Sequence, residues 1–253
     1  MILFRSLLYF LALVFSTLFF ATLLLLVGWV LPFHRRSQIA NKWGSTNLTL
    51  QQWLCGLDYR VTGQENIPAS NCVILSKHQS AWETIALRHI MPAQQVWVLK
   101  RELMWIPFFG WALALFHPIA IDRKSGRKAV SQIIRQGTEQ LKKGRWVVIF
   151  PEGTRVAPGE RKRYGIGGAL LAEHSGYPVL PVAHNAGVYW RRRGILKYPG
   201  TIQVVIGPVI ETDGLRATEI NARVEEWIES TMAALPQTRD EVNTQLNRGS
   251  NRE

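Results

Sequence analysis

The sequence predicts an α/β fold with a mostly parallel sheet flanked by helices, preceded by an N-terminal membrane-anchoring helix. Beyond residue 57, short apolar runs alternate with helical patterns, and this alternation implies crossover connections and a parallel sheet. The chain has 253 residues, of which 47% are hydrophobic and 19% charged, enough for one packed domain and an appendage. The appendage is visible at once, because no charged residue occurs from Ser6 to Phe33.

We expect residues 1–33 to form the membrane anchor. As one helix the uncharged stretch would be about 40 Å long, against a hydrocarbon core of about 30 Å. It is too long for the apolar region of a cleavable signal peptide. Arg35, Arg36 and Lys42 follow it, whereas Arg5 alone precedes it, so the positive-inside bias favours a cytoplasmic body. An anchor half-buried in one leaflet would satisfy the same bias, and both topologies stay open.

A juxtamembrane helix is expected at 34–56, the catalytic domain at 57–236 and a disordered polar tail at 237–253. Val130, Ile133, Ile134 and Leu141 give one of the domain's helices a single apolar stripe. The expected strands are 58–63, 72–77, 95–99, 118–122, 145–150, 178–183 and 202–206. The expected helices between them are 80–90, 126–143, 167–175 and 215–234.

The uncharged run from Met104 to Phe116 fits this alternation poorly. It could form a core helix. Pro107 and Gly110 would spoil a regular buried helix, so the alternative is a surface ridge that dips into lipid or lines an apolar tunnel.

The formal net charge is +12, which suits either nucleic acid or an anionic membrane surface. The basic residues occur in short clusters, at 161–163 and 191–193, beside a chain that already carries an anchor. Ten tryptophans also favour a membrane interface, so we expect membrane lipids and no nucleic acid as partners. Cys55 and Cys72 have no metal-ligand spacing, and no metal is expected.

The first polar group at a strand end is His78, and Glu83 follows it five residues later. In open α/β sheets ligands bind outside the carboxyl ends of the strands. A histidine there can take a proton from a substrate hydroxyl, and a carboxylate can hold its other ring nitrogen. Ser80 and Glu83 also fit a capping box, in which Glu83 would serve the helix N-terminus alone.

Two further strands end in polar groups that can converge with His78 on one crevice. One strand is followed by Asp122 and Arg123, the other by the run from Glu152 to Arg155. Arginine suits phosphate oxygens, so this edge predicts a site for an anionic substrate with a hydroxyl to activate. Individually, the first pair could be a surface ion pair and the second run an ordinary turn.

These residues carry a family resemblance over roughly residues 70–185. The chain resembles the 1-acylglycerol-3-phosphate acyltransferase family in four ordered blocks: His78 to Glu83, Phe116 to Arg123, Phe150 to Arg155, and Val179 to Val182. The first block ends in Glu83, where the family more often has aspartate. In the fourth block Leu180 is inserted before the proline.

The resemblance implies transfer of a fatty acyl group from acyl-CoA or acyl-carrier protein to the sn-2 hydroxyl of lysophosphatidic acid, giving phosphatidic acid without a cofactor. His78 would be the general base and Glu83 would orient it. The acceptor phosphate would bind Lys100, Arg123 and Arg155, in a pocket that Glu152, Gly153 and Thr154 shape.

Two alternatives stay open from the sequence. One is an acyltransferase for a different lysolipid acceptor, which the unusual Glu83 keeps possible. The other is a non-enzymatic membrane-anchored basic protein that binds anionic lipid or nucleic acid, in which His78 is structural.

Overall fold

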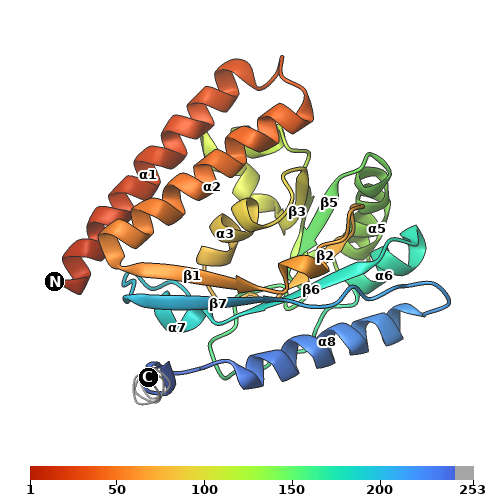
Figure 1. Cartoon of the computed structure of the whole chain (residues 1–253). Helices are drawn as coiled ribbons and strands as arrows, with labels where there is room; N and C mark the ends of the chain where they lie inside the picture. Colours follow the sequence, from red (N-terminus) through yellow and green to blue (C-terminus); the bar gives the residue numbers. More distant parts are fainter. Residues whose placement is uncertain (243–253) are drawn as a thin grey trace.

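A computed structural model describes residues 1–242 and contains a seven-stranded sheet in the order β1-β7-β6-β2-β5-β3-β4 (Figure 1). Each of the seven strands expected from the sequence is present. The strands are β1 (Leu57–Thr62), β2 (Val73–Ser76), β3 (Gln95–Lys100), β4 (Ile119–Ile121), β5 (Trp146–Ile149), β6 (Val179–His184) and β7 (Gly200–Ile206).

The sheet is mostly parallel, as predicted. β2 pairs in parallel with β5 and β6, β3 pairs in parallel with β4 and β5, and β1 pairs in parallel with β7. β6 and β7 are antiparallel. The carboxyl ends of β2, β3, β4 and β5 therefore lie at one edge, where the sequence places its polar groups.

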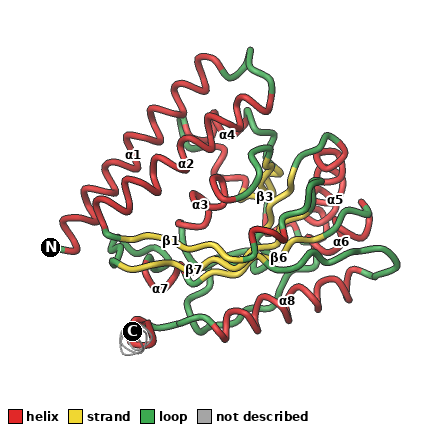
Figure 2. The backbone as a smooth tube through the Cα atoms, viewed as in Figure 1, coloured by secondary structure: helices red, strands yellow, loops and turns green. Residues whose placement is uncertain are grey.

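Helices cover both faces of the sheet (Figures 1 and 2). Alternate residues of a strand point to opposite faces, so Ile74 packs with Trp82 of α3 (Trp82–Ile90), whereas Leu75 packs with Ile133 of α5. The face that receives Leu75 is covered by α5 (Arg127–Lys142), α6 (Gly167–Ser175) and α8 (Ala217–Ala234).

Four short helices were not expected from the sequence, because each is too brief to show a period. They are α7 (Ala186–Tyr189) and the 3-10 turns η1 (Gln64–Asn66), η2 (Arg101–Trp105) and η3 (Arg123–Ser125). Of the expected tail at 237–253, residues 243–253 lie outside the described part of the chain.

The uncharged N-terminal stretch is not one helix. α1 (Ile2–Val27) and α2 (Phe33–Cys55) form an antiparallel hairpin (Figure 1), with the turn at residues 28–32. Proline lacks the N–H that an uninterrupted helix would need, and Pro32 stands where α2 begins. α1 alone is still long and apolar enough to cross a membrane.

Both ends of the α1–α2 hairpin are fixed to the domain. Near the start of α1, Tyr9 is buried and its ring meets Trp190 edge-on at 5.8 Å. There too, the Ser6 hydroxyl oxygen accepts a hydrogen bond of 2.9 Å from the Lys197 N–H. Near the start of α2, the Arg36 guanidinium donates to the Leu115 carbonyl at 2.7 Å.

The run from Met104 to Phe116 combines features of both expectations. It forms η2 and the short helix α4 (Phe109–Ala114), separated at Pro107. A Cβ at Gly110 would meet the Met104 carbonyl oxygen at 2.3 Å, so this position requires glycine. Ala112 and Phe116 are buried. Trp105, Ile106, Phe108 and Trp111 form an exposed apolar ridge.

Candidate active site

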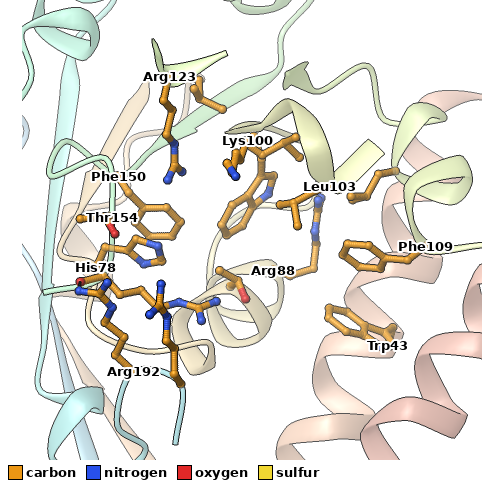
Figure 3. A pocket seen from close by; sticks show the side chains of 17 residues that line it. Trp43, His78, Arg88, Lys100, Leu103, Phe109, Arg123, Phe150, Thr154 and Arg192 are labelled. Carbon is orange, nitrogen blue, oxygen red and sulfur yellow. Dashed lines mark hydrogen bonds between the residues drawn. The ribbon is translucent and has the colours of Figure 1, made fainter. Parts of the chain in front are cut away.

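His78 lies two residues beyond the end of β2, and its imidazole borders a cavity (Figure 3). Its Nδ1 is 2.7 Å from Oε1 of Glu83. The ring stacks on Phe150 with the centroids 4.0 Å apart. With Nδ1 protonated toward Glu83, Nε2 is left to accept a proton, and no residue within 1–242 makes a hydrogen bond to it.

Glu83 orients His78 and also holds the backbone that leads into α3, but the expected capping box does not form, because α3 begins after Ala81 without a side-chain cap. Its Oε1 also accepts the N–H of Gln79 at 2.9 Å and that of Ser80 at 2.8 Å. Burial by itself would raise the pKa of the Glu83 carboxyl, but the imidazoles of His184 and His78 and the Ser80 N–H stabilise the carboxylate. The pKa of Glu83 consequently lies below its usual value.

Glu152 holds the backbone of His78. Its Oε2 accepts the His78 N–H at 2.7 Å, while the His78 carbonyl accepts the Val156 N–H at 2.8 Å. The Glu152 side chain is buried, and its Oε1 forms an ion pair of 2.7 Å with Nζ of Lys77. Glu152 and Gly153 do not line the cavity, so the pocket-shaping role expected of Glu152 is replaced by this inward contact.

The cavity has a volume of about 420 Å³ and contains six cationic side chains but no carboxylate among its described lining residues. Thr154 and three of the predicted phosphate ligands, Lys100, Arg123 and Arg155, line it. Burial lowers the pKa of Arg123; the nearby Glu102 carboxylate opposes this effect, and the charge of Arg155 adds to it. Two cations close enough to repel each other form a site that favours a phosphate dianion.

Three cavity arginines were not predicted as site residues. Arg192 and Arg193 line the cavity although the sequence indicated only a basic cluster for the membrane surface. Arg192 donates to the Arg155 carbonyl at 2.9 Å, and in Figure 3 Arg123 and Arg192 lie on either side of His78. Arg88 belongs to the amphipathic stretch of α3, and no local signal distinguishes it from a surface arginine.

Arg88 lies where the cavity beside His78 meets a second, apolar pocket of about 70 Å³. Its guanidinium lies 5.2 Å from the Phe116 ring centroid and 5.5 Å from that of Trp97. Burial lowers the pKa of Arg88 to about 10. α1, α2 and α4 supply the other walls of the apolar pocket, with Leu24, Trp43 and Leu113 among them. A ligand with a charged end and a hydrocarbon end matches this pair of cavities.

Within residues 1–242 no three His, Cys, Asp or Glu side chains gather in an arrangement that could hold a metal ion. The polar groups that line the cavity are the imidazole, the cations and the hydroxyls of Thr84 and Thr154, with the Glu83 carboxylate behind the imidazole. An imidazole oriented by a carboxylate, facing cations, can activate a hydroxyl on an anionic substrate.

Comparison with known proteins agrees with this chemistry. Residues 58–185 match the family model described as Acyltransferase. The chain is 50% identical over 236 residues to the 1-acyl-sn-glycerol-3-phosphate acyltransferase of Pseudomonas aeruginosa, covering 91% of each protein. The chain belongs to this acyltransferase family.

More distant members of the family and a solved structure give the same result. The mouse 1-acyl-sn-glycerol-3-phosphate acyltransferase alpha is 29% identical over 68% of this chain and 61% of its own length. The crystal structure of the 1-acyl-sn-glycerophosphate acyltransferase of Thermotoga maritima has a TM-score of 0.77, with 22% identity, over 92% of this chain and 95% of that one. That likeness establishes the shared fold. Family membership excludes the non-enzymatic alternative.

Proposed function

We propose that the protein transfers a fatty acyl group from a thioester to the sn-2 hydroxyl of 1-acylglycerol 3-phosphate. The observation that carries the proposal is the His78–Glu83 pair, which opens into a cavity that is cationic at one end and apolar at the other. The Pseudomonas relative is named for this acceptor. Lysophosphatidic acid has an anionic headgroup, a free hydroxyl and one acyl chain, which match these features in turn.

In the proposed reaction, Nε2 of His78 takes the proton as the acceptor hydroxyl oxygen attacks the thioester carbonyl carbon. Glu83 stabilises the imidazolium that forms. When the tetrahedral intermediate collapses, the carbon–sulfur bond breaks, and His78 returns the proton to the leaving thiolate. The products are phosphatidic acid and a free thiol, and no covalent acyl-enzyme is needed.

The acceptor phosphate is proposed to bind Arg123 and Arg155, with Lys100 and Arg192 close by. Guanidinium groups can each make two parallel hydrogen bonds to phosphate oxygens. No acidic side chain among the described residues lines the cavity. Lys100 is already paired with Glu102 at 3.0 Å, so Arg123 and Arg155 are the main proposed ligands. An acceptor whose phosphate is esterified to choline carries less negative charge and would use the site less well.

We further propose that the α1–α2 hairpin is half-buried in one leaflet and that the catalytic domain lies on the cytoplasmic side. Ser6 and Tyr9 near one end of α1 contact the domain, and Leu24 near its other end helps to line the apolar pocket. A helix bound to the domain at both ends is poorly placed to cross a bilayer away from it. The basic residues that follow α1 favour the cytoplasmic side.

The deciding experiment is acyl transfer by purified full-length protein to a panel of lysolipids. Lysophosphatidic acid should be acylated in preference to lysophosphatidylcholine and lysophosphatidylethanolamine. Running the panel with acyl-CoA and with acyl-carrier protein identifies the donor. A preference for a zwitterionic lysolipid would replace the proposed acceptor, and no transfer to any member with either donor would refute the proposal.

A further inference from the structure

Behind His78, on the side of the sheet away from the cavity, lies a buried group of charges that the proposed reaction does not use. Lys77 directly precedes His78 and is 1% exposed. Its Nζ lies 2.7 Å from Oε1 of Glu152 and 2.7 Å from Oε1 of Glu229. Glu229 belongs to α8, more than 140 residues further along the chain, and does not line the cavity that contains His78.

Glu229 has two further partners. It accepts the Tyr164 hydroxyl at 2.8 Å and forms an ion pair of 3.2 Å with Nε of Arg161, whose side chain is mostly exposed. Lys77 is thus the buried cation between the Glu152 and Glu229 carboxyl groups. Burying a lysine costs several kcal/mol unless it is paired, whereas an apolar side chain would fill the space at no electrostatic cost. The charge at position 77 therefore calls for a functional explanation.

The explanation we draw is that Lys77 is connected to His78 through Glu152. Glu152 uses one carboxylate oxygen for Lys77 and the other for the His78 N–H at 2.7 Å. If the Glu152 carboxylate rotated, the backbone of His78 would lose this acceptor. Only two contacts would then hold His78 in place: that of its Nδ1 with Glu83 and that of its carbonyl with the Val156 N–H. Lys77, itself held by Glu229, opposes this rotation through its ion pair with Glu152.

We propose that Lys77 and Glu229 are positioning residues: through Glu152 they fix the backbone of His78, and so the direction of its Nε2 toward the acceptor hydroxyl. α8 thereby becomes part of the catalytic apparatus without touching substrate. The inference rests on the proposed function, since it assigns His78 the role of general base.

The test compares Lys77→Met, Glu229→Gln and the double variant with the full-length protein, and uses Glu226→Gln on the exposed side of α8 as control. Methionine keeps an unbranched side chain of similar length without the charge. We expect Lys77→Met to lower kcat by about tenfold to a hundredfold, the cost of a displaced catalytic group. KM for the acceptor should change by less than about threefold, because the phosphate ligands are intact.

The double variant separates positioning from folding. Removing both charges leaves fewer unpaired ions in the interior, so its melting temperature should rise above that of Lys77→Met while its kcat stays low. Recovery of kcat to within about threefold of the unmutated protein would reduce the group to a structural ion pair. A loss confined to KM would contradict the proposal as well.

Failure of the proposed function would look different. The variants are compared with whichever lysolipid the unmutated protein acylates, so a different acceptor leaves the comparison intact. An unmutated protein that acylates nothing, or a His78→Ala variant that keeps full activity, would refute the general-base role itself. Glu226→Gln should match the unmutated protein in kcat, KM and melting temperature.

Discussion

Charged side chains are arranged differently on the two sides of the turn that contains His78. On the cavity side, six cationic side chains line a space without a carboxylate. On the interior side, Glu152 and Glu229 each lie 2.7 Å from Lys77, and Arg161 reaches Glu229 from the surface at 3.2 Å. Unbalanced charge around a cavity indicates a ligand of opposite sign, whereas paired charge inside the protein holds parts of the chain in place. The same turn thus separates substrate binding from substrate-independent support.

His78 lies at the boundary of the two sides, and we expect its substitution to have the largest effect on activity. His78→Ala should lower kcat by about 10²- to 10⁴-fold, the usual contribution of a general base. The melting temperature should change little, because the imidazole borders the cavity. Steady-state assays alongside a melting curve check this. Activity within a few-fold of the unmutated protein, with folding intact, would remove His78 from the mechanism.

Glu83→Gln should come next. Glutamine can still accept the N–H groups of Gln79 and Ser80, but it is neutral and cannot stabilise the imidazolium. We expect kcat to fall by roughly 10²-fold, with a much smaller change in melting temperature. The reverse pattern, full activity with lowered stability, would leave Glu83 with these backbone contacts as its only role. Glu83→Asp, one methylene shorter, should keep part of the activity.

Arg155→Ala should act on the acceptor and leave folding unchanged, as expected of the cavity side. Losing a charge-assisted contact costs about 1.5–3 kcal/mol, equivalent to roughly a 10- to 150-fold higher KM for lysophosphatidic acid. Arg155→Lys should restore part of it, because an ammonium cannot make the bidentate contact. Kinetics with each substrate varied in turn decide the matter. An effect confined to the acyl donor would place Arg155 outside the phosphate site.

The interior side predicts a smaller effect, on stability and its dependence on pH. Burial raises the pKa of Glu152 from 4.5 to about 7, against the opposing pull of Lys77 and the His78 N–H. A carboxyl whose pKa is raised on folding stabilises the folded state fully below pH 4.5, and this contribution is lost as pH rises through 7. The shift corresponds to about 3 kcal/mol.

The measurement is the free energy of unfolding in detergent at pH 5 and pH 8. Unmutated protein should be less stable at pH 8 by up to about that amount from Glu152, and Glu152→Gln should show a smaller difference between the two pH values. Glu226→Gln, which alters an exposed carboxyl on the same protein, serves as control. An identical pH dependence for Glu152→Gln and the unmutated protein would show that this carboxyl does not titrate there.

The local sequence pattern was sufficient to predict much of the fold and the residues at the centre of the site. Strand ends and apolar periodicity depend on neighbouring residues, so His78, Arg123 and Arg155 could be assigned to one edge from the sequence. The direction of β7 could not, because a strand reads alike in parallel and antiparallel sheets. The apolar composition of residues 6–33 also concealed the turn before Pro32.

The remaining site residues depend on contacts between distant segments. Glu152 follows a strand end just as His78 does, and only packing against Lys77 turns its carboxylate inward. Glu229 lies on an ordinary amphipathic helix, and its burial follows from the packing of α8 against β6 and α6. Arg88 likewise becomes a cavity residue because α2 and α4 line the same two pockets as its side chain. None of these positions carries a signal within its own neighbourhood.

The α1–α2 hairpin, which we propose attaches the protein to lipid, also contributes walls to the cavity: Trp43 lines both the cavity beside His78 and the apolar pocket, and Leu24 lines the latter. The same two helices would consequently serve both membrane attachment and substrate binding. A version freed from the bilayer by cutting the hairpin away would lose part of its substrate-binding wall together with its membrane affinity. For this fold, solubility in water and activity therefore make opposite demands on the hairpin. A soluble, active variant would have to replace the apolar outer face of α1 and keep the face that carries Leu24.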